Sequence, residues 1–210
     1  MAISEAVAGT LVDRKICNQS HIRVIGNPII VKQVPESSSN AELLPALEER
    51  EYICAIGRLA EPKGFDGLLQ AFAQMRDQKV DLVILGEGPL RAELTEQAER
   101  LGIADRVHMP GFVSEPERVL SKAMLFVLSS CWEGFGNVLV EALATGVPIV
   151  STDCQGAPRA LLRDGALGHL SDPAFLADKL AGDKGVAARE HLLAFGRQSR
   201  ERIAERVAAW

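Results

Sequence analysis

The stretch SSCWEGFGNVLVEALATG, residues 129–146, predicts a strand end, a tight glycine loop and a helix in succession. The apolar run at 125–128 stops at two serines, and Gly134 and Gly136 then interrupt the chain before a segment of helical composition. The rest of the chain can be arranged around this turn.

Two carboxylates bracket the start of the predicted helix. Glu133 precedes it, and Glu141 is the only charged residue between Phe135 and Thr145, in a helix that is apolar nearly all round and is expected to be buried. A buried carboxylate needs a partner, and a sugar hydroxyl would suit Glu141. The free N–H groups and positive dipole end of the helix favour an anion, phosphate above all. The alternative is that Glu133 caps its own helix and Glu141 pairs with an arginine.

The segment EGFGNVLVEALATGVPIVSTD resembles the E-x7-E signature of retaining GT-B glycosyltransferases of group 1, which use nucleotide-sugar donors. The likeness runs from about Ile22 to Gly168. It implies that Glu133 orients the hydroxyls of the donor sugar and that Glu141 accepts a hydrogen bond from the ribose. It also implies a donor-binding loop and helix start with backbone N–H groups for the diphosphate, formed by Gly134, Phe135, Gly136, Asn137 and Val138.

A second candidate motif is GRLAEPKG, residues 57–64. Its two cations follow an apolar strand and precede a helix, where arginine can bind two phosphate oxygens and lysine supplies a mobile charge. On their own, such residues are most often simply solvated. The motif resembles the family's GR…KG loop, which implies that Gly57, Arg58 and Lys63 hold the donor diphosphate, with Arg58, Lys63 and Glu133 as the catalytic residues.

Two further loops bear on the ligand. VHMPGFVSE, residues 107–115, resembles the family's base-contacting segment, which implies that Phe112 and Val113 contact the nucleobase; the alternative is an apolar pair in the core. LGEGPL, residues 85–90, lacks the third glycine of a dinucleotide fingerprint, so nicotinamide chemistry is disfavoured.

The pattern of apolar runs predicts an α/β fold. Strands are expected at 52–56, 82–85, around Val107, 125–128 and 148–151, alternating with helices near 65–75, 90–101, 117–122 and the central helix. Continuous apolar strands alternating with helices indicate a Rossmann-like parallel sheet with helices on both faces. The resemblance implies that this sheet is the C-terminal half of a GT-B fold.

Three regions are expected along the chain. Residues 1–50 are predicted to be the end of an otherwise missing N-terminal, acceptor-binding domain plus a linker that begins near Lys32. Residues 51–170 are predicted to be the nucleotide-sugar-binding domain, and residues 171–210 a charged helical tail.

Composition excludes several classes of function. The net charge of −5 disfavours nucleic acid as a partner, and no apolar run approaches the roughly eighteen residues of a membrane span. The N-terminus lacks the pattern of a secretory signal, and the four cysteines have no metal-ligand spacing, so we expect a cytoplasmic protein with reduced thiols. No metal and no other cofactor is expected.

The resemblance leaves two main functions open. The first is transfer of a sugar, with retention of configuration, from a nucleotide sugar to a glycan or lipid-linked acceptor, with peripheral membrane association at the inner face through the missing domain. The second is a non-catalytic nucleotide-sugar-binding module, or a truncated fragment that needs a partner acceptor domain. A third reading, another GT-B enzyme such as an epimerase or phosphorylase, fits the motifs less well.

Overall fold

The computed structural model describes residues 1–29, 50–75 and 78–171. Six parallel strands form one sheet in the order β3-β2-β1-β4-β5-β6. Their bounds are Tyr52–Ile56 (β1), Asp81–Leu85 (β2), Val107–Gly111 (β3), Leu125–Leu128 (β4), Ile149–Thr152 (β5) and His169–Ser171 (β6). The predicted Rossmann-like α/β fold is confirmed.

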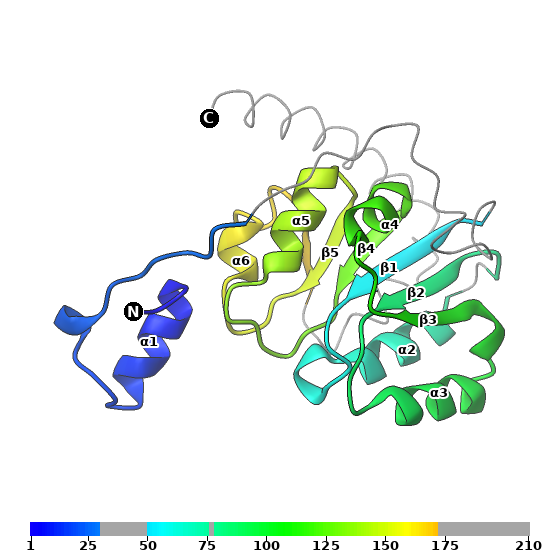
Figure 1. Cartoon of the computed structure of the whole chain (residues 1–210), viewed down its shortest axis with the longest axis horizontal. Helices are drawn as coiled ribbons and strands as arrows, with labels where there is room; N and C mark the ends of the chain where they lie inside the picture. Colours follow the sequence, from blue (N-terminus) through cyan, green and yellow to red (C-terminus); the bar gives the residue numbers. More distant parts are fainter. Residues whose placement is uncertain (30–49, 76–77, 172–210) are drawn as a thin grey trace.

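Helices cover both faces of the sheet because successive residues of a strand point to opposite sides. The helices are α2 (Phe65–Ala73), α3 (Arg91–Arg100), α4 (Pro116–Lys122), α5 (Asn137–Thr145) and α6 (Pro158–Leu161). Ile53 and Ala55 of β1 pack in the core beneath α2 and α3, whereas Tyr52 and Cys54 pack in the core beneath α4 and α5 (Figure 1). Each helix buries apolar residues on its sheet side, so the two cores hold the three layers together.

The strand order reverses between β1 and β4. The chain runs outward from β1 through β2 to β3 and then returns to place β4 on the other side of β1. The loops that leave the carboxyl ends of β1 and β4 therefore lead to helices on opposite faces of the sheet. This is its topological switch point, the position at which α/β folds have their ligand crevice, and the region between the two loops is called the crevice below. The motifs at residues 57–64 and 129–137 both lie here.

The first 29 residues form a separate layer at one side of the sheet (Figure 1). Helix α1 (Glu5–Asp13) begins at Ser4, whose Oγ accepts a hydrogen bond from the N–H of Val7, and a short helix η1 (Gln19–His21) follows. A parallel bridge between Ala2 and Val24 closes the segment on itself. This segment lies within residues 1–50, which the sequence analysis assigned to the end of an N-terminal domain and a linker.

Two features of the structure differ from the sequence-based predictions, and two predicted segments lie outside the described residues. Helix α5 is not buried all round: Leu139 and Ala142 are buried, while Asn137 and Ala144 are exposed, because neither layer covers its outer side. Strand β6 was not predicted, since three residues with mixed polarity carry no periodic signal. The predicted linker at 32–49 and the tail beyond Ser171 lie outside the described residues.

No helix in the described part of the chain is long and apolar enough to cross a membrane.

Candidate functional site

Glu133 is the centre of the crevice between β1 and β4. Its side chain is buried, at 6% exposure for the residue, and its Oε1 accepts hydrogen bonds from Lys63 Nζ at 2.5 Å and from Ser130 Oγ at 2.7 Å. Helix α5 has Gly136 as its N-cap and no side-chain cap, so the alternative in which Glu133 caps its own helix is wrong. The carboxylate instead joins the loops that follow the two strands.

Lys63 reaches Glu133 by lying across the end of β1. It is the last residue of η3 (Glu61–Lys63), and its side-chain carbons lie 3.3–3.4 Å from where a Cβ on Gly57 would stand. The absence of a side chain at Gly57 thus leaves room for the lysine stem. The Lys63 ammonium and the Glu133 carboxylate are both largely shielded from water, so their attraction is stronger than that of an ion pair in open solvent.

Hydrogen bonds to backbone carbonyl groups hold the two loops together around this ion pair. Ser129 Oγ donates to the carbonyl of Lys63 at 2.8 Å, and the N–H of Cys131 donates to the carbonyl of Pro62 at 2.9 Å. Gly64 has φ +60°, and a Cβ there would stand 2.3 Å from the carbonyl oxygen of Ser129. Only glycine permits this approach, which explains the residue that follows Lys63.

The loop after β5 supports Glu133 from the other side. The N–H of Glu133 donates to the carbonyl of Gln155 at 3.0 Å, next to the parallel bridge between Trp132 and Gln155. Gly156 has φ +140°, and a Cβ on it would stand 1.8 Å from the carbonyl oxygen of Glu133. The loop after β5 therefore fixes the backbone of Glu133, while the loop after β1 supplies Lys63 to its side chain.

Glu141 lies in a different environment, four residues into α5. Burial raises the pKa of its carboxyl, and the charge of Glu117 on α4 raises it further. No arginine among the described residues is recorded as an ion-pair partner of Glu141, so the predicted alternative of an arginine pair finds no support there. The residue is half-buried rather than buried, in contrast to the expectation from sequence.

The N-terminus of α5 opens beside Glu133. The helix start leaves the first N–H groups without an intrahelical acceptor, including those of Asn137 and Val138. Gly136, at φ +83°, turns the chain into the helix, and Gly134 and Phe135 form the loop before it. All five residues predicted for this turn are thus brought together at the crevice.

The remaining predicted residues lie on the same edge of the sheet. Arg58 is exposed two residues after the end of β1, and no described residue is recorded as its partner. Phe112 and Val113 follow β3; Phe112 is 82% exposed, whereas Val113 packs partly against the core shared with α4 and α5. The alternative of an apolar core pair therefore holds for Val113 but not for Phe112.

Three contacts from the N-terminal segment to this loop were not predicted. Ser4 Oγ donates to the carbonyl of Gly134 at 2.7 Å, and Asn27 Nδ2 donates to Asn137 Oδ1 at 2.9 Å. A Cβ on Gly26 would stand 3.3 Å from the ring of Phe135. Partners separated by more than a hundred residues leave no periodic signal in the sequence. Ser130 could have been suspected, since it is one of two serines that follow an apolar strand.

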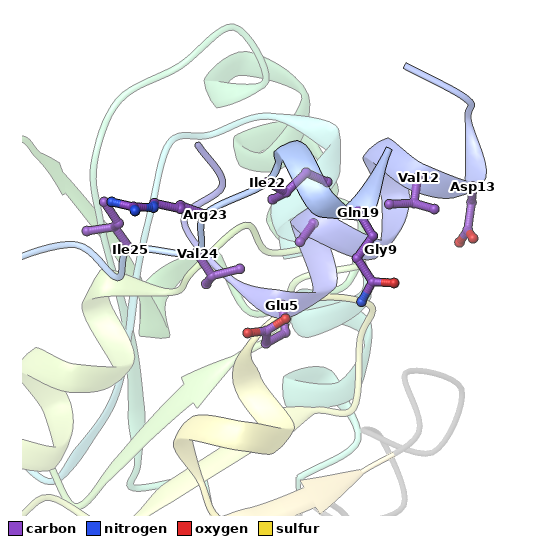
Figure 2. A pocket seen from close by; sticks show the side chains of 10 residues that line it. Glu5, Gly9, Val12, Asp13, Gln19, Ile22, Arg23, Val24 and Ile25 are labelled. Carbon is purple, nitrogen blue, oxygen red and sulfur yellow. The ribbon is translucent and has the colours of Figure 1, made fainter. Parts of the chain in front are cut away.

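A pocket of about 820 Å³ lies apart from these residues, between α1 and the segment that follows η1 (Figure 2). Glu5 and Asp13 line it from the helix, and Arg23 and Ile25 line it from the returning chain. It includes none of the predicted site residues, so its size alone gives it no place in the chemistry of the crevice.

Comparison with known proteins places the fold and the motifs in one family. A family model described as "Glycosyl transferases group 1" matches residues 39–184, which include both motifs of the crevice. The chain belongs to the group 1 glycosyl transferases.

Relatives in this family share about a third of the aligned residues. An uncharacterised glycosyltransferase of Methanocaldococcus jannaschii is 33% identical over 156 residues, covering 69% of this chain and 38% of the relative. The lipopolysaccharide core biosynthesis glycosyltransferase LpsE of Rhizobium meliloti is 34% identical over 154 residues, covering 73% of this chain and 42% of the relative. The chain therefore spans about four tenths of the length of these group 1 relatives.

Solved structures show the same fold. HepE of Anabaena, crystallised with UDP and glucose, superposes with a TM-score of 0.76 at 24% identity, over 100% of this chain and 62% of HepE. The agreement confirms that this group 1 chain has the fold of a GT-B glycosyltransferase domain.

Proposed function

We propose that this group 1 chain binds a nucleoside-diphosphate sugar and forms the donor-binding part of a retaining glycosyltransferase. The observation that carries the proposal is the Lys63–Glu133 ion pair in the crevice between β1 and β4, beside the open N-terminus of α5. It sets a cation, a carboxylate and free N–H groups side by side, which matches the alternation of phosphate and sugar hydroxyls in such a donor.

The diphosphate is the part of the donor that these charges favour most. A lysine ammonium has three donors, and Glu133 takes one, so Lys63 keeps capacity for a phosphate oxygen. Arg58 is exposed at the same strand end and can bind two oxygens at once. Together with the N–H groups of Asn137 and Val138, these cations would stabilise negative charge as the nucleoside diphosphate departs, without a metal.

The two carboxylates suit the sugars on either side of the diphosphate. Both recorded donors to Glu133 use Oε1, so Oε2 is left to orient hydroxyls of the transferred sugar. Burial and the charge of Glu117 raise the pKa of the half-buried Glu141, which would accept a hydrogen bond from a ribose hydroxyl. Phe112 and Val113 would contact the base, with the exposed ring of Phe112 available for stacking.

In the proposed reaction, the bond between the anomeric carbon and the phosphate oxygen breaks, and an acceptor hydroxyl bonds to the same face of that carbon. The proton of the acceptor hydroxyl leaves with the diphosphate. Arg58 and Lys63 neutralise the leaving group, and Glu133 fixes the sugar, so these three residues act on the reacting atoms. HepE was crystallised with UDP and glucose, which supports a donor of this class.

The acceptor is proposed to be a glycan or a lipid-linked sugar, bound by an N-terminal domain that precedes residues 1–29 in the GT-B arrangement. The relative LpsE acts in lipopolysaccharide core biosynthesis, which supports such an acceptor. We place the reaction in the cytoplasm, at the inner face of the membrane, where that domain would meet a lipid-linked acceptor.

A second candidate function is a binding module without turnover of its own. All the contacts proposed above for the crevice are with the donor, and none of the described residues has been assigned to an acceptor, which fits a module that only binds the donor. Both functions predict donor binding, and only the first predicts transfer once an acceptor domain is supplied.

The test is calorimetric titration of the chain with UDP, GDP, ADP and their sugar conjugates. We expect one nucleotide to bind, and the double variant Arg58→Ala, Lys63→Ala to weaken that binding at least a hundredfold, since two charge-assisted contacts are lost at roughly tenfold or more each. The matched control is Arg14→Ala, Lys15→Ala, which removes one arginine and one lysine from the exposed end of α1.

The control variant should bind like the unmodified chain. Absence of binding to every nucleotide by a chain shown to be folded would overturn the proposed donor site. Equal losses in the site and control variants would show that net charge, rather than the crevice, binds the nucleotide.

A further inference from the structure

Asn137 is the first residue of α5, and a residue far away in the sequence holds its side chain. Its Oδ1 accepts a hydrogen bond from Asn27 Nδ2 at 2.9 Å, across a separation of 110 residues. Asn137 is exposed at the helix start, and Asn27 lies at the end of the N-terminal segment. The contact thus joins that segment to the mouth of the crevice.

The hydrogen bond decides which way the Asn137 carboxamide faces. A carboxamide has an oxygen on one side and an NH₂ group on the other, so an oxygen turned toward Asn27 leaves the NH₂ group turned away from it. At the N-terminus of a helix, a free donor adds to the N–H groups that attract an anion. The opposite rotamer would present a carbonyl oxygen there, which repels phosphate.

The segment that carries Asn27 is itself fixed to the loop before α5. Ser4 is buried at 8% exposure and donates to the carbonyl of Gly134, while its Oγ also caps α1. Gly26, next to Asn27, lies against the ring of Phe135, where a Cβ would stand 3.3 Å from the nearest ring carbon. The position of Asn27 relative to Asn137 is therefore set by the loop that both of them meet.

We propose that Asn27 is a positioning residue that turns the Asn137 amide so that it donates to the diphosphate of the donor. The inference rests on the proposed function, because it names a residue that prepares the same site without touching the ligand. In this proposal, Asn27 acts only through Asn137. Its effect on ligand affinity should therefore disappear when the Asn137 amide is removed, which a general structural role would not predict.

Two variants of Asn27 test the orientation. In Asn27→Asp, the side chain keeps its shape but can only accept, so Asn137 turns its NH₂ group toward position 27 and its oxygen toward the phosphate. We expect a loss of about tenfold or more in nucleoside diphosphate affinity, the size of a charge-assisted hydrogen bond. In Asn27→Ala, both rotamers of Asn137 become accessible, and affinity should fall only about twofold.

The new charge of Asn27→Asp could also repel the ligand, so the Asn27→Asp and Asn137→Ala changes are combined in a double-mutant cycle, with each chain titrated with UDP, GDP and ADP. In the Asn137→Ala background, we expect Asn27→Asp to have little further effect, because there is no amide left to turn. A purely electrostatic effect would persist in that background and would weaken as salt is added. Thermal unfolding of all four chains shows that each is folded.

The outcomes separate the two proposals. If the unmodified chain binds none of the three nucleotides, the proposed function fails and takes this inference with it. If it binds one of them and Asn27→Asp binds equally well, or loses the same factor with and without Asn137, the donor site stands and the role of Asn27 is overturned. A loss in Asn27→Asp that disappears in the Asn137→Ala background supports the proposal.

Discussion

The loop that carries Glu133 and the middle of α5 each hold one carboxylate of the E-x7-E spacing, and their surroundings differ. Glu133 is the more buried of the two, and Lys63 and Ser130 already donate to it. Glu141 is half-buried, and burial together with Glu117 raises the pKa of its carboxyl. The protein therefore stabilises the charge of Glu133 with two hydrogen bonds, whereas the charge of Glu141 is less well stabilised, although the two residues belong to the same sequence motif.

The difference has a consequence for the roles proposed above. A carboxylate held by an ion pair keeps its geometry whether ligand is present or absent, as a group that orients a reacting sugar must. A carboxylate with a raised pKa gains most when a ligand donates to it. Changes at the two positions should therefore affect stability in opposite directions.

The largest effect is expected from Gly156→Ala in the loop that supports Glu133. Its Cβ would stand 1.8 Å from a backbone carbonyl at a φ of +140°, so the loop must shift, and we expect the free energy of unfolding to fall by about 4 kcal/mol. Urea unfolding measures it. Gly67→Ala in α2 is the control: nothing lies within 4 Å of its added Cβ, and it should stabilise by about 0.5–1 kcal/mol. Equal effects at the two glycines would mean that Gly156 does not support Glu133.

Lys63→Ala should come next, since it leaves Glu133 buried without its cation. We expect a loss of about 2 kcal/mol, below the value for a fully buried pair because Lys63 is partly exposed. The double variant with Glu133→Gln should recover part of this loss in the same urea experiment, as no unpaired charge remains. A double variant less stable than Lys63→Ala alone would show that Lys63 does not stabilise the fold by neutralising Glu133.

Ser130→Ala tests the second donor to Glu133. The buried hydroxyl lies 2.7 Å from Oε1, and its loss should cost about 1.5 kcal/mol, the usual size for a hydrogen bond to a charged group. The control is Ser121→Ala on α4, whose hydroxyl bonds only a carbonyl of its own helix. A difference of less than a few tenths of a kcal/mol between the two serines would contradict a role for Ser130 in holding Glu133.

Glu141→Gln should have the smallest effect on stability, with the opposite sign at neutral pH. Because the folded state raises the pKa of Glu141, the folded chain binds a proton more readily than the unfolded chain, and stability falls as pH rises through the raised pKa. The variant should therefore be slightly more stable than the unmodified chain at pH 7, and the difference should vanish in acid, below the ordinary carboxyl pKa. Unfolding at several pH values, with Glu93→Gln on α3 as control, measures it; a pH-independent difference would exclude the raised pKa as its cause.

The fold was predictable wherever a helix or strand has a local sequence pattern of its own. Five strands and the helices between them follow from continuous apolar runs, and β6 escaped because His169–Ser171 is too short to show one. That the loops after the strands share one edge also follows from sequence, because all strands of a parallel sheet end on the same side. The strand order, which places the crevice between β1 and β4, does not follow from it. The partial exposure of α5 did not, because what covers a helix depends on residues far along the chain.

The candidate site was predictable as a set of residues but not as a set of contacts. The resemblance named Lys63 and Glu133, yet nothing in a single sequence pairs two residues 70 positions apart. The same holds for Gly156 against the carbonyl of Glu133 and for Asn27 on Asn137, which depend on how loops from different strands approach each other. Each is a non-local contact with no periodicity to reveal it.

The pairing of β1 with β4 also sets when the crevice can exist during synthesis of the chain. β1 leaves the ribosome before β2 and β3, and its neighbour β4 and the glutamate opposite Lys63 follow only after those two strands have been made. Non-local strand pairing of this kind is slow to form, since a long loop must close first. A nucleotide that binds the completed crevice therefore stabilises only chains that have passed this step, and so shifts newly made protein toward the folded state.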